Sequence, residues 1–219
     1  MTAKRKGTEL EYLKNYRLLF DNLSKVADIQ AEMAEYGYDQ TAIDEGKALY
    51  EKAELLYNER KVESAEEKKA YDTFAIKLEE LKEFYKKDRK KAKVALLKNT
   101  ELYQYFQLNK QLPQAYLKLM QEAKFFYEQI QTNLEAKPLL ARLKLTEEVA
   151  TSRLELVNTT FTLRVEYEKE KGESQQATKD KNKAFEDIAE WIRDFYAVAE
   201  IALEDHPQLM ESIGKFVRS

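Results

Sequence analysis

The stretch FAIKLEELKEFYKKDRKKAKVAL, residues 74–96, carries apolar side chains at helical spacing: Phe74, Leu78, Leu81, Tyr85, Ala92 and Ala95. Residues three and four apart share one face of an α-helix, so this pattern predicts an amphipathic helix. Upstream, Ser64 and Glu67 form the S-x-x-E pattern of a capping box. We therefore expect a helix that begins at Ser64 and runs for about 35 residues, or roughly 50 Å.

The composition favours long helices in the rest of the chain. Hydrophobic residues make up 43% and charged residues 35% of the 219 residues, a balance typical of helices with one buried stripe and one solvated face. Only five glycines and three prolines are available for turns, whereas sheets and loop-rich folds need many such residues. The composition therefore predicts an all-α protein.

Apolar periodicity divides the chain into six long and two short helices. Gly37 suits the end of the first helix because glycine tolerates a positive φ, and Gly172 is expected to stop a later one, with Ser174 capping the next. The predicted helices cover about 9–36, 40–61, 64–98, 101–108, 113–136, 138–170, the segment from Ser174 through Leu203, and 207–217.

The two halves of the chain resemble each other. FAIKLEELKEFY (74–85) aligns without a gap on FEDIAEWIRDFY (185–196), with identical residues at four positions. Further on, residues 94–96 match residues 201–203 once a gap of four residues is placed between. We interpret this as a tandem duplication with a spacing of about 110 residues. The expected fold is an elongated antiparallel bundle of two duplicated three-helix units, 1–109 and 110–219, that form one domain or two.

The residue inventory excludes several classes of chemistry. There is no cysteine, so disulfides, thiolate metal sites and cysteine nucleophiles are absent. His206 is the only histidine, too few for a Glu-x-x-His di-iron site or an H-E-x-x-H zinc site, and its place before Pro207 suggests a turn or capping residue. Neither phosphate-binding glycine motif occurs. We expect a non-enzymatic protein without a cofactor.

Two groups of acidic residues are candidate metal ligands. Glu79 and Glu83 lie one turn apart on one helix, and Glu186, Glu190 and Asp194 repeat that spacing in the second half. Because they point away from the buried seam of Leu81 and Tyr85, a solvated face paired with lysines is the favoured interpretation. The layout and the E-x-x-x-D pattern of Glu190 and Asp194 resemble the PhoU family of phosphate-signalling regulators, which implies metal binding through acidic clusters. Glu79 and Glu83 depart from that pattern.

A basic run is the candidate interaction patch. It consists of Lys86, Lys87, Arg89, Lys90, Lys91 and Lys93, with Asp88 as its one acidic member. Acidic residues early and basic residues late in a helix complement the helix dipole, which favours a solvated face. The run could also dock an acidic protein, or bind nucleic acid or an anionic membrane in a salt-sensitive manner. The net charge of −3 argues against a general affinity for nucleic acid.

These observations predict a helical scaffold or protein–protein interaction module with a protein partner, and leave self-association open. No apolar run approaches the ~20 residues of a membrane-spanning helix, and no signal peptide follows the basic N-terminus, so a cytoplasmic location is expected. A PhoU-like regulator that binds a divalent metal is the first alternative. A protein that associates with DNA or anionic membranes through residues 86–93 is the second.

Overall fold

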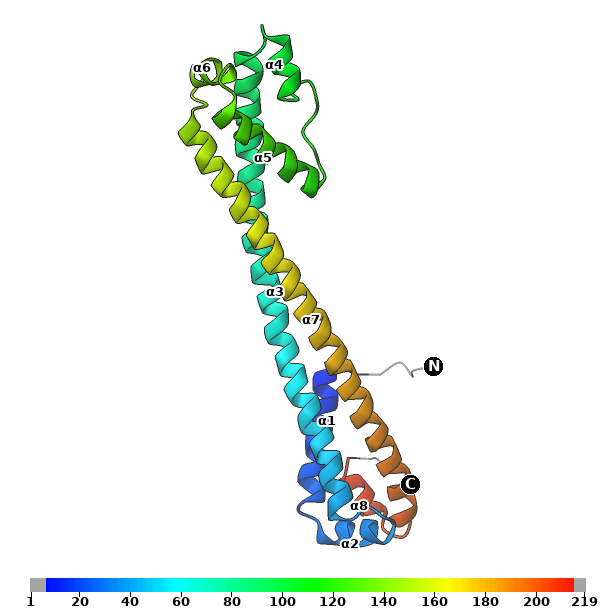
Figure 1. Ribbon diagram of the computed structural model, residues 1–219. Coiled ribbons are helices and arrows are strands. Elements are labelled where there is room, and N and C mark those ends of the chain that lie inside the picture. Colours follow the sequence, from blue (N-terminus) through cyan, green and yellow to red (C-terminus); the bar gives the residue numbers. More distant parts are fainter. Residues whose placement is uncertain (1–6, 215–219) are drawn as a thin grey trace. The chain divides into compact units, whose positions relative to one another are not determined.

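The computed structural model describes residues 7–214, and within that range the chain is all-α, as the composition predicts (Figure 1). Its helices differ in length from the predicted ones. They are α1 (Glu9–Leu23), α2 (Ala27–Glu35), α3 (Gln40–Ala95), α4 (Thr100–Tyr105), α5 (Tyr116–Thr132), α6 (Ala136–Ala141), α7 (Glu147–Ala202) and α8 (Pro207–Ser212). The predicted end of the last helix, at about 217, lies outside the described residues.

The predicted helix starts at Ser64 and Ser174 are wrong, because α3 and α7 are each continuous over 56 residues. No glycine or proline occurs from residue 47 to residue 112, so nothing in that stretch stops α3. A glycine inside a helix costs only about 0.5–1 kcal/mol, which α7 tolerates at Gly172. Ser174 is buried, and its carbonyl accepts a hydrogen bond from the Thr178 hydroxyl at 2.9 Å.

The predicted helix over 9–36 is in fact two helices. The Ser24 hydroxyl donates to the Asp21 carbonyl at 2.8 Å, and the Gln30 amide donates to the Leu23 carbonyl at 2.6 Å, so side chains satisfy the backbone where α1 ends. The end of α2 is as predicted: Gly37 has a φ of 87°, a conformation that glycine adopts at little cost.

The chain divides into two compact units. Unit 1 contains residues 1–64 and 173–219, and unit 2 contains residues 65–172. Each long helix therefore contributes one part to each unit. These units do not coincide with the predicted ranges 1–109 and 110–219, whose boundary falls inside unit 2.

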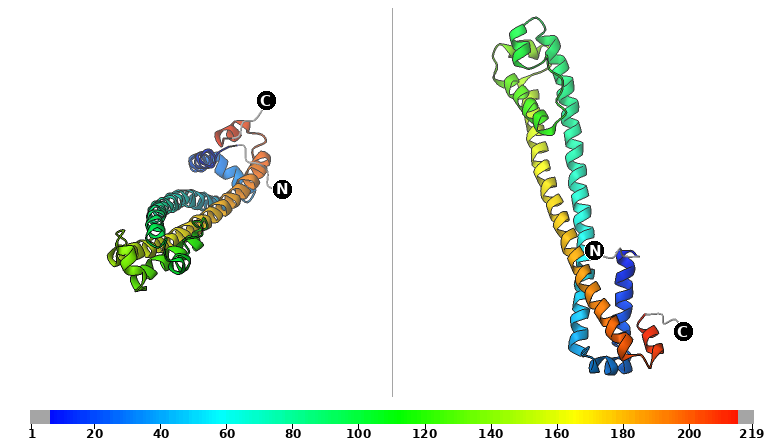
Figure 2. Two further views of the ribbon diagram at one scale, coloured as in Figure 1. Left: turned by 90° about the horizontal axis from the view of Figure 1, so that it is seen from above. Right: turned by 90° about the vertical axis from the view of Figure 1, so that its right-hand side faces the viewer.

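Unit 1 packs α1, α2 and α8 against the first part of α3 and the last part of α7 (Figure 2). The indole of Trp191 stacks on Phe195 with ring centroids 5.2 Å apart and contacts Phe20 at 5.5 Å. Gly46 of α3 faces this indole so closely that a Cβ there would lie 2.3 Å from a ring atom. A glycine is required at this position because the aromatic side chain occupies the space of any larger residue.

Unit 2 packs α4, α5 and α6 around the last part of α3 and the first part of α7, as both views of Figure 2 show. Its centre is aromatic: Tyr85, Phe106 and Tyr127 surround Phe126 with ring centroids 5.2–5.8 Å away, all at steep angles. This edge-to-face geometry is the preferred arrangement of aromatic pairs.

Equivalent elements recur at a spacing of 107 residues. The starts of α1 and α5 (residues 9 and 116), of α3 and α7 (40 and 147) and of α4 and α8 (100 and 207) are all separated by this number. The four described residues with a positive φ pair in the same way: Gly37 with Lys144, and Gln107 with Gly214. Asp39 and Thr146, which cap α3 and α7, are also 107 apart.

Candidate functional site

The basic run of residues 86–93 lies on α3 within unit 2, and the structure separates its members. Asp88 and Arg89 are buried, with 2% and 3% of their surfaces exposed. Lys91 is half-buried, and the remaining lysines of the run are exposed. The run therefore has a buried side and a solvated side, and the two must be considered separately.

Ion pairs divide the exposed lysines further. Lys87 lies 3.8 Å from a Glu83 oxygen, and Lys91 lies 3.2 Å from an Asp88 oxygen. In the part of the chain that the structure describes, no carboxylate lies within ion-pair distance of Lys86, Lys90 or Lys93.

Lys86, Lys90 and Lys93 have i, i+4, i+7 spacing and so share one face of α3. Like charges at this spacing destabilise a helix by about 0.2–0.5 kcal/mol per pair. The unpaired lysines are therefore concentrated on one face, at a cost to stability.

Arg89 fastens a turn of the chain beside these lysines. Its Nη2 donates to the carbonyls of Gln107 at 3.0 Å and Lys110 at 2.8 Å, and its Nη1 donates to the Tyr85 hydroxyl at 3.2 Å. Gln107 has a φ of 53°, which directs the chain away from the end of α4. Burial raises the pKa of Tyr85, and the hydrogen bond and charge of Arg89 oppose that rise. A buried guanidinium thus holds residues 107–110 against α3.

Between α3 and this turn lies a cavity of about 390 Å³, which we call the basic cavity. Its lining consists of Lys86, Arg89, Lys90, Lys93, Asn109, Lys110, Gln111 and Leu112. Five of these side chains are cationic, two are amides, and none is a carboxylate. Chemically, the cavity presents hydrogen-bond donors and positive charge, which suits an anion.

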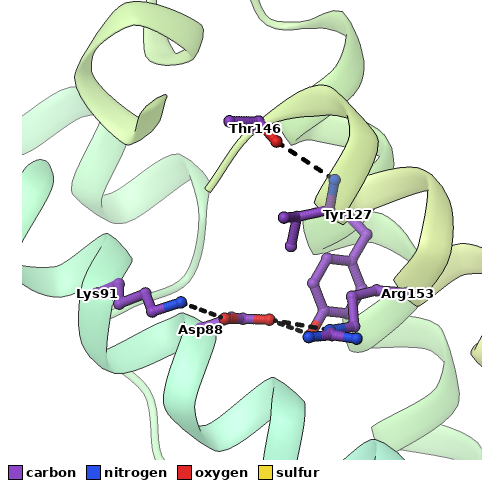
Figure 3. Close-up of polar contacts among 6 residues, drawn as sticks. Asp88, Lys91, Tyr127, Thr146 and Arg153 are labelled. Atoms are coloured by element: carbon purple, nitrogen blue, oxygen red, sulfur yellow. Dashed lines mark hydrogen bonds and ion pairs between the residues drawn. The ribbon is translucent and has the colours of Figure 1, made fainter. Parts of the chain in front are cut away.

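On the other side of the same helical turn lies a charged centre, formed by Asp88, Lys91, Tyr127 and Arg153 (Figure 3). Asp88 accepts a hydrogen bond from the Tyr127 hydroxyl at 3.1 Å and from Arg153 Nε at 3.4 Å, in addition to the Lys91 pair. Arg153 also lies over the Phe84 ring, 3.4 Å from its centroid. Burial, and secondarily the Asp88 charge, raise the pKa of Tyr127. The buried carboxylate is thus compensated by two cations and a hydroxyl.

Unit 1 carries different side chains at the positions 107 residues away. Phe195, Tyr196, Ala197 and Glu200 stand where unit 2 has Asp88, Arg89, Lys90 and Lys93, and Gly46 stands where unit 2 has Arg153. The Tyr196 hydroxyl donates to the Ile213 carbonyl at 2.7 Å, next to the turn that ends α8. A neutral side chain therefore contacts the turn in unit 1 at the position where unit 2 uses a buried arginine.

The candidate metal ligands are exposed and engaged with cations. Glu79 pairs with Lys82 at 2.5 Å and Glu83 with Lys87. Arg193 lies 3.5 Å from Glu190 and 3.1 Å from Asp194, and Glu186 is exposed nearby on α7. Glu79 and Glu83 belong to unit 2 and the other three to unit 1, so neither compact unit combines the two acidic groups.

His206 is an exposed residue at the N-terminal cap position of α8, and its side chain makes no capping hydrogen bond. The prediction of a turn residue is confirmed, and the imidazole takes no part in the basic cavity.

No family model matches the chain, and searches of curated proteins and of solved structures return no match either. Among the helices of residues 7–214, none combines the length and the apolar character that crossing a membrane requires.

Proposed function

We propose that the protein is a non-enzymatic helical scaffold, an interaction module that docks an acidic segment of a protein partner in the basic cavity of unit 2. The single observation that carries this proposal is the lining of that cavity by five cations and no carboxylate. An acidic peptide supplies the negative charge that Lys86, Lys90 and Lys93 lack within the chain. Charge complementarity of this kind directs partner choice and accelerates association.

The rest of the site supports a binding role. The cavity has a fixed wall, because Arg89 ties the 107–110 turn to α3 through two backbone carbonyls. A preformed wall reduces the ordering cost that binding must overcome. The Leu112 side chain adds an apolar contact at the edge of the cavity, which gives a peptide partner more to recognise than charge alone.

The architecture that presents the site is part of the proposal. We infer that the chain arose by tandem duplication, with a spacing of 107 residues in place of the about 110 expected from the alignment. The recurrence of helix starts, caps and positive-φ residues at this spacing supports the inference. The basic cavity then belongs to one unit only, since unit 1 has Ala197 and Glu200 in place of two of its lysines.

A binding assay with matched charge variants tests the proposal. A fluorescently labelled glutamate-rich peptide is titrated with the protein at low salt, and anisotropy is recorded. We expect binding that Lys90→Ala/Lys93→Ala abolishes and that Lys82→Ala/Lys87→Ala preserves, because Lys82 and Lys87 are paired with Glu79 and Glu83. Both double variants remove two positive charges from α3.

Other outcomes of the same assay contradict the proposal. Absence of peptide binding to the wild type, or an equal loss in both double variants, would show that the cavity is not the docking site. Tighter binding to duplex DNA or to phosphatidylserine vesicles than to the peptide would favour a nucleic-acid or membrane partner instead.

A further inference from the structure

We propose that a phosphoryl group on the acidic partner segment is the anchoring group that the basic cavity recognises. This inference rests on the proposed function, because it names the chemistry of the ligand at the same site. Three features of the cavity carry it: the concentration of unpaired positive charge, the donor-only lining and the fixed position of its wall.

The charge of the cavity exceeds what single carboxylates balance well. Lys86, Lys90 and Lys93 converge from one helix face, and Lys110 and Arg89 complete the lining. A carboxylate brings one negative charge and two acceptor oxygens, whereas a phosphoryl group brings about −1.5 to −2 charge and three acceptor oxygens at pH 7. A phosphoryl group therefore neutralises more of the lysine charge at one point.

The kinds of donor in the lining point the same way. Lysine ammonium groups are compact point charges that bind phosphate from several directions, whereas planar carboxylates are best matched by the fork of an arginine. The one arginine present, Arg89, is buried, and its Nη2 atom is occupied by the carbonyls of Gln107 and Lys110. Arg89 thus acts as a positioning residue, and the lysines are the groups available to a ligand.

The comparison between the two units shows that the fold does not need these lysines. Residues 107 positions away in unit 1 are Arg193, Ala197 and Glu200 in place of Lys86, Lys90 and Lys93, and Arg193 is paired with Glu190 and Asp194. The unpaired charge is specific to unit 2. A helix tolerates three unpaired lysines on one face most readily where a ligand neutralises them.

The experiment compares two short glutamate-rich peptides that are identical except for a central serine, which is phosphorylated in one of them. Binding to the full chain is measured by anisotropy at low salt. We expect phosphorylation to tighten binding by about tenfold or more, through one to three charge-assisted hydrogen bonds. Lys90→Ala or Lys93→Ala should remove this gain, and Lys87→Ala should keep it. All three lysines are exposed, and circular dichroism verifies that the variants fold.

The pH dependence gives a second readout. The second pKa of a phosphoryl group is about 6, while that of a glutamate carboxyl is about 4.3. As the pH falls from 7 to 5, the phosphorylated peptide loses negative charge and should lose most of its advantage. The unphosphorylated peptide should change little over the same range.

Each remaining outcome is informative. Equal affinity for the two peptides would overturn this inference and leave the proposed function standing, whereas failure of both peptides to bind would overturn both. Tighter binding of vesicles that contain a phosphoinositide, or of free pyrophosphate, would assign the phosphoryl group to a lipid or a small molecule and would also overturn it.

Discussion

Alanine at Gly46 and alanine at Gly172 are expected to change stability in opposite directions. Both glycines lie inside 56-residue helices, where replacing glycine with alanine normally stabilises by about 1 kcal/mol. At Gly172 no atom lies within 4 Å of the added Cβ, so the full gain of about 0.5–1 kcal/mol should appear.

At Gly46 the added Cβ would lie 2.3, 2.4 and 2.6 Å from three atoms of the Trp191 ring. Carbon atoms normally approach to about 3.5–4.0 Å, so the indole has to move by about 1 Å. Phe20 and Phe195 contact the ring and resist this movement. Overpacking costs about 1–3 kcal/mol, and a rigid ring puts this site near the upper end. After subtraction of the helix-propensity gain, Gly46→Ala should destabilise by roughly 2 kcal/mol.

Urea unfolding measures both effects. Trp191 is the only tryptophan and belongs to unit 1, so its fluorescence reports the unit that contains Gly46, and circular dichroism follows all helices. The reasoning is refuted at Gly46 if alanine stabilises unit 1, or if Trp191→Leu does not reduce the cost of Gly46→Ala. It is refuted at Gly172 if alanine destabilises, as it would if this glycine ended a helix in a left-handed conformation.

Three further predictions concern the turn beside the cavity, the tyrosines and the connection between helices. Arg89→Met should destabilise by about 2 kcal/mol in urea unfolding, because it leaves buried carbonyls without donors, while Met at the exposed Lys90 should change stability by less than about 0.5 kcal/mol; similar values for the two would contradict the anchoring role. Burial, followed by Glu54, raises the pKa of Tyr50 to about 12 from 10.0, so stability that is complete below pH 10 should fall between pH 10 and 12, since the unfolded state loses its proton first; Tyr50→Phe should flatten that decline in alkaline unfolding curves, and an unchanged slope would count against it. Cleavage at a protease site inserted between residues 109 and 114 should leave the two fragments associated in size-exclusion chromatography, because each unit contains segments from both sides of the cut; separate elution would contradict this composition of the units.

Periodicity and composition were sufficient to predict an all-α chain, but not where its helices end. The S-x-x-E pattern at Ser64 is common by chance in a sequence with so many glutamates, and only the absence of glycine and proline over the next residues indicated that α3 continues. Gly172 looked like a stop signal, yet its helix has strong formers on both sides. A single unfavourable residue cannot end a helix that tertiary packing holds on both sides of it.

The alignment of the two halves shows a second kind of limit. A shift of four residues is about one helical turn and keeps apolar residues on the same face. Matching Phe74 to Phe185 therefore looked as good as the match at a spacing of 107, in which Trp191 corresponds to Phe84. Caps and positive-φ residues, which have no such periodicity, reveal the spacing.

The site itself was only half visible. The basic run could be read directly, but the turn at residues 107–110 that completes the cavity comes about twenty residues later, and no local pattern connects the two. One signal was available: Asp88 occupies a position of the buried stripe between Tyr85 and Ala92. A charged residue at such a position predicts buried partners, which the structure identifies as Tyr127 and Arg153.

The composition of the two units also determines the order in which the protein can be made. Unit 2 is one continuous segment and is complete once residue 172 has left the ribosome, whereas unit 1 joins the two ends of the chain. The ion pair between Glu9 and Lys181, for example, links residues 172 apart in sequence. Local contacts form faster than distant ones, so α1 and α2 must wait with their apolar faces uncovered until synthesis is almost finished. The N-terminal helices are thus the segments most exposed to chaperones and to aggregation during biosynthesis.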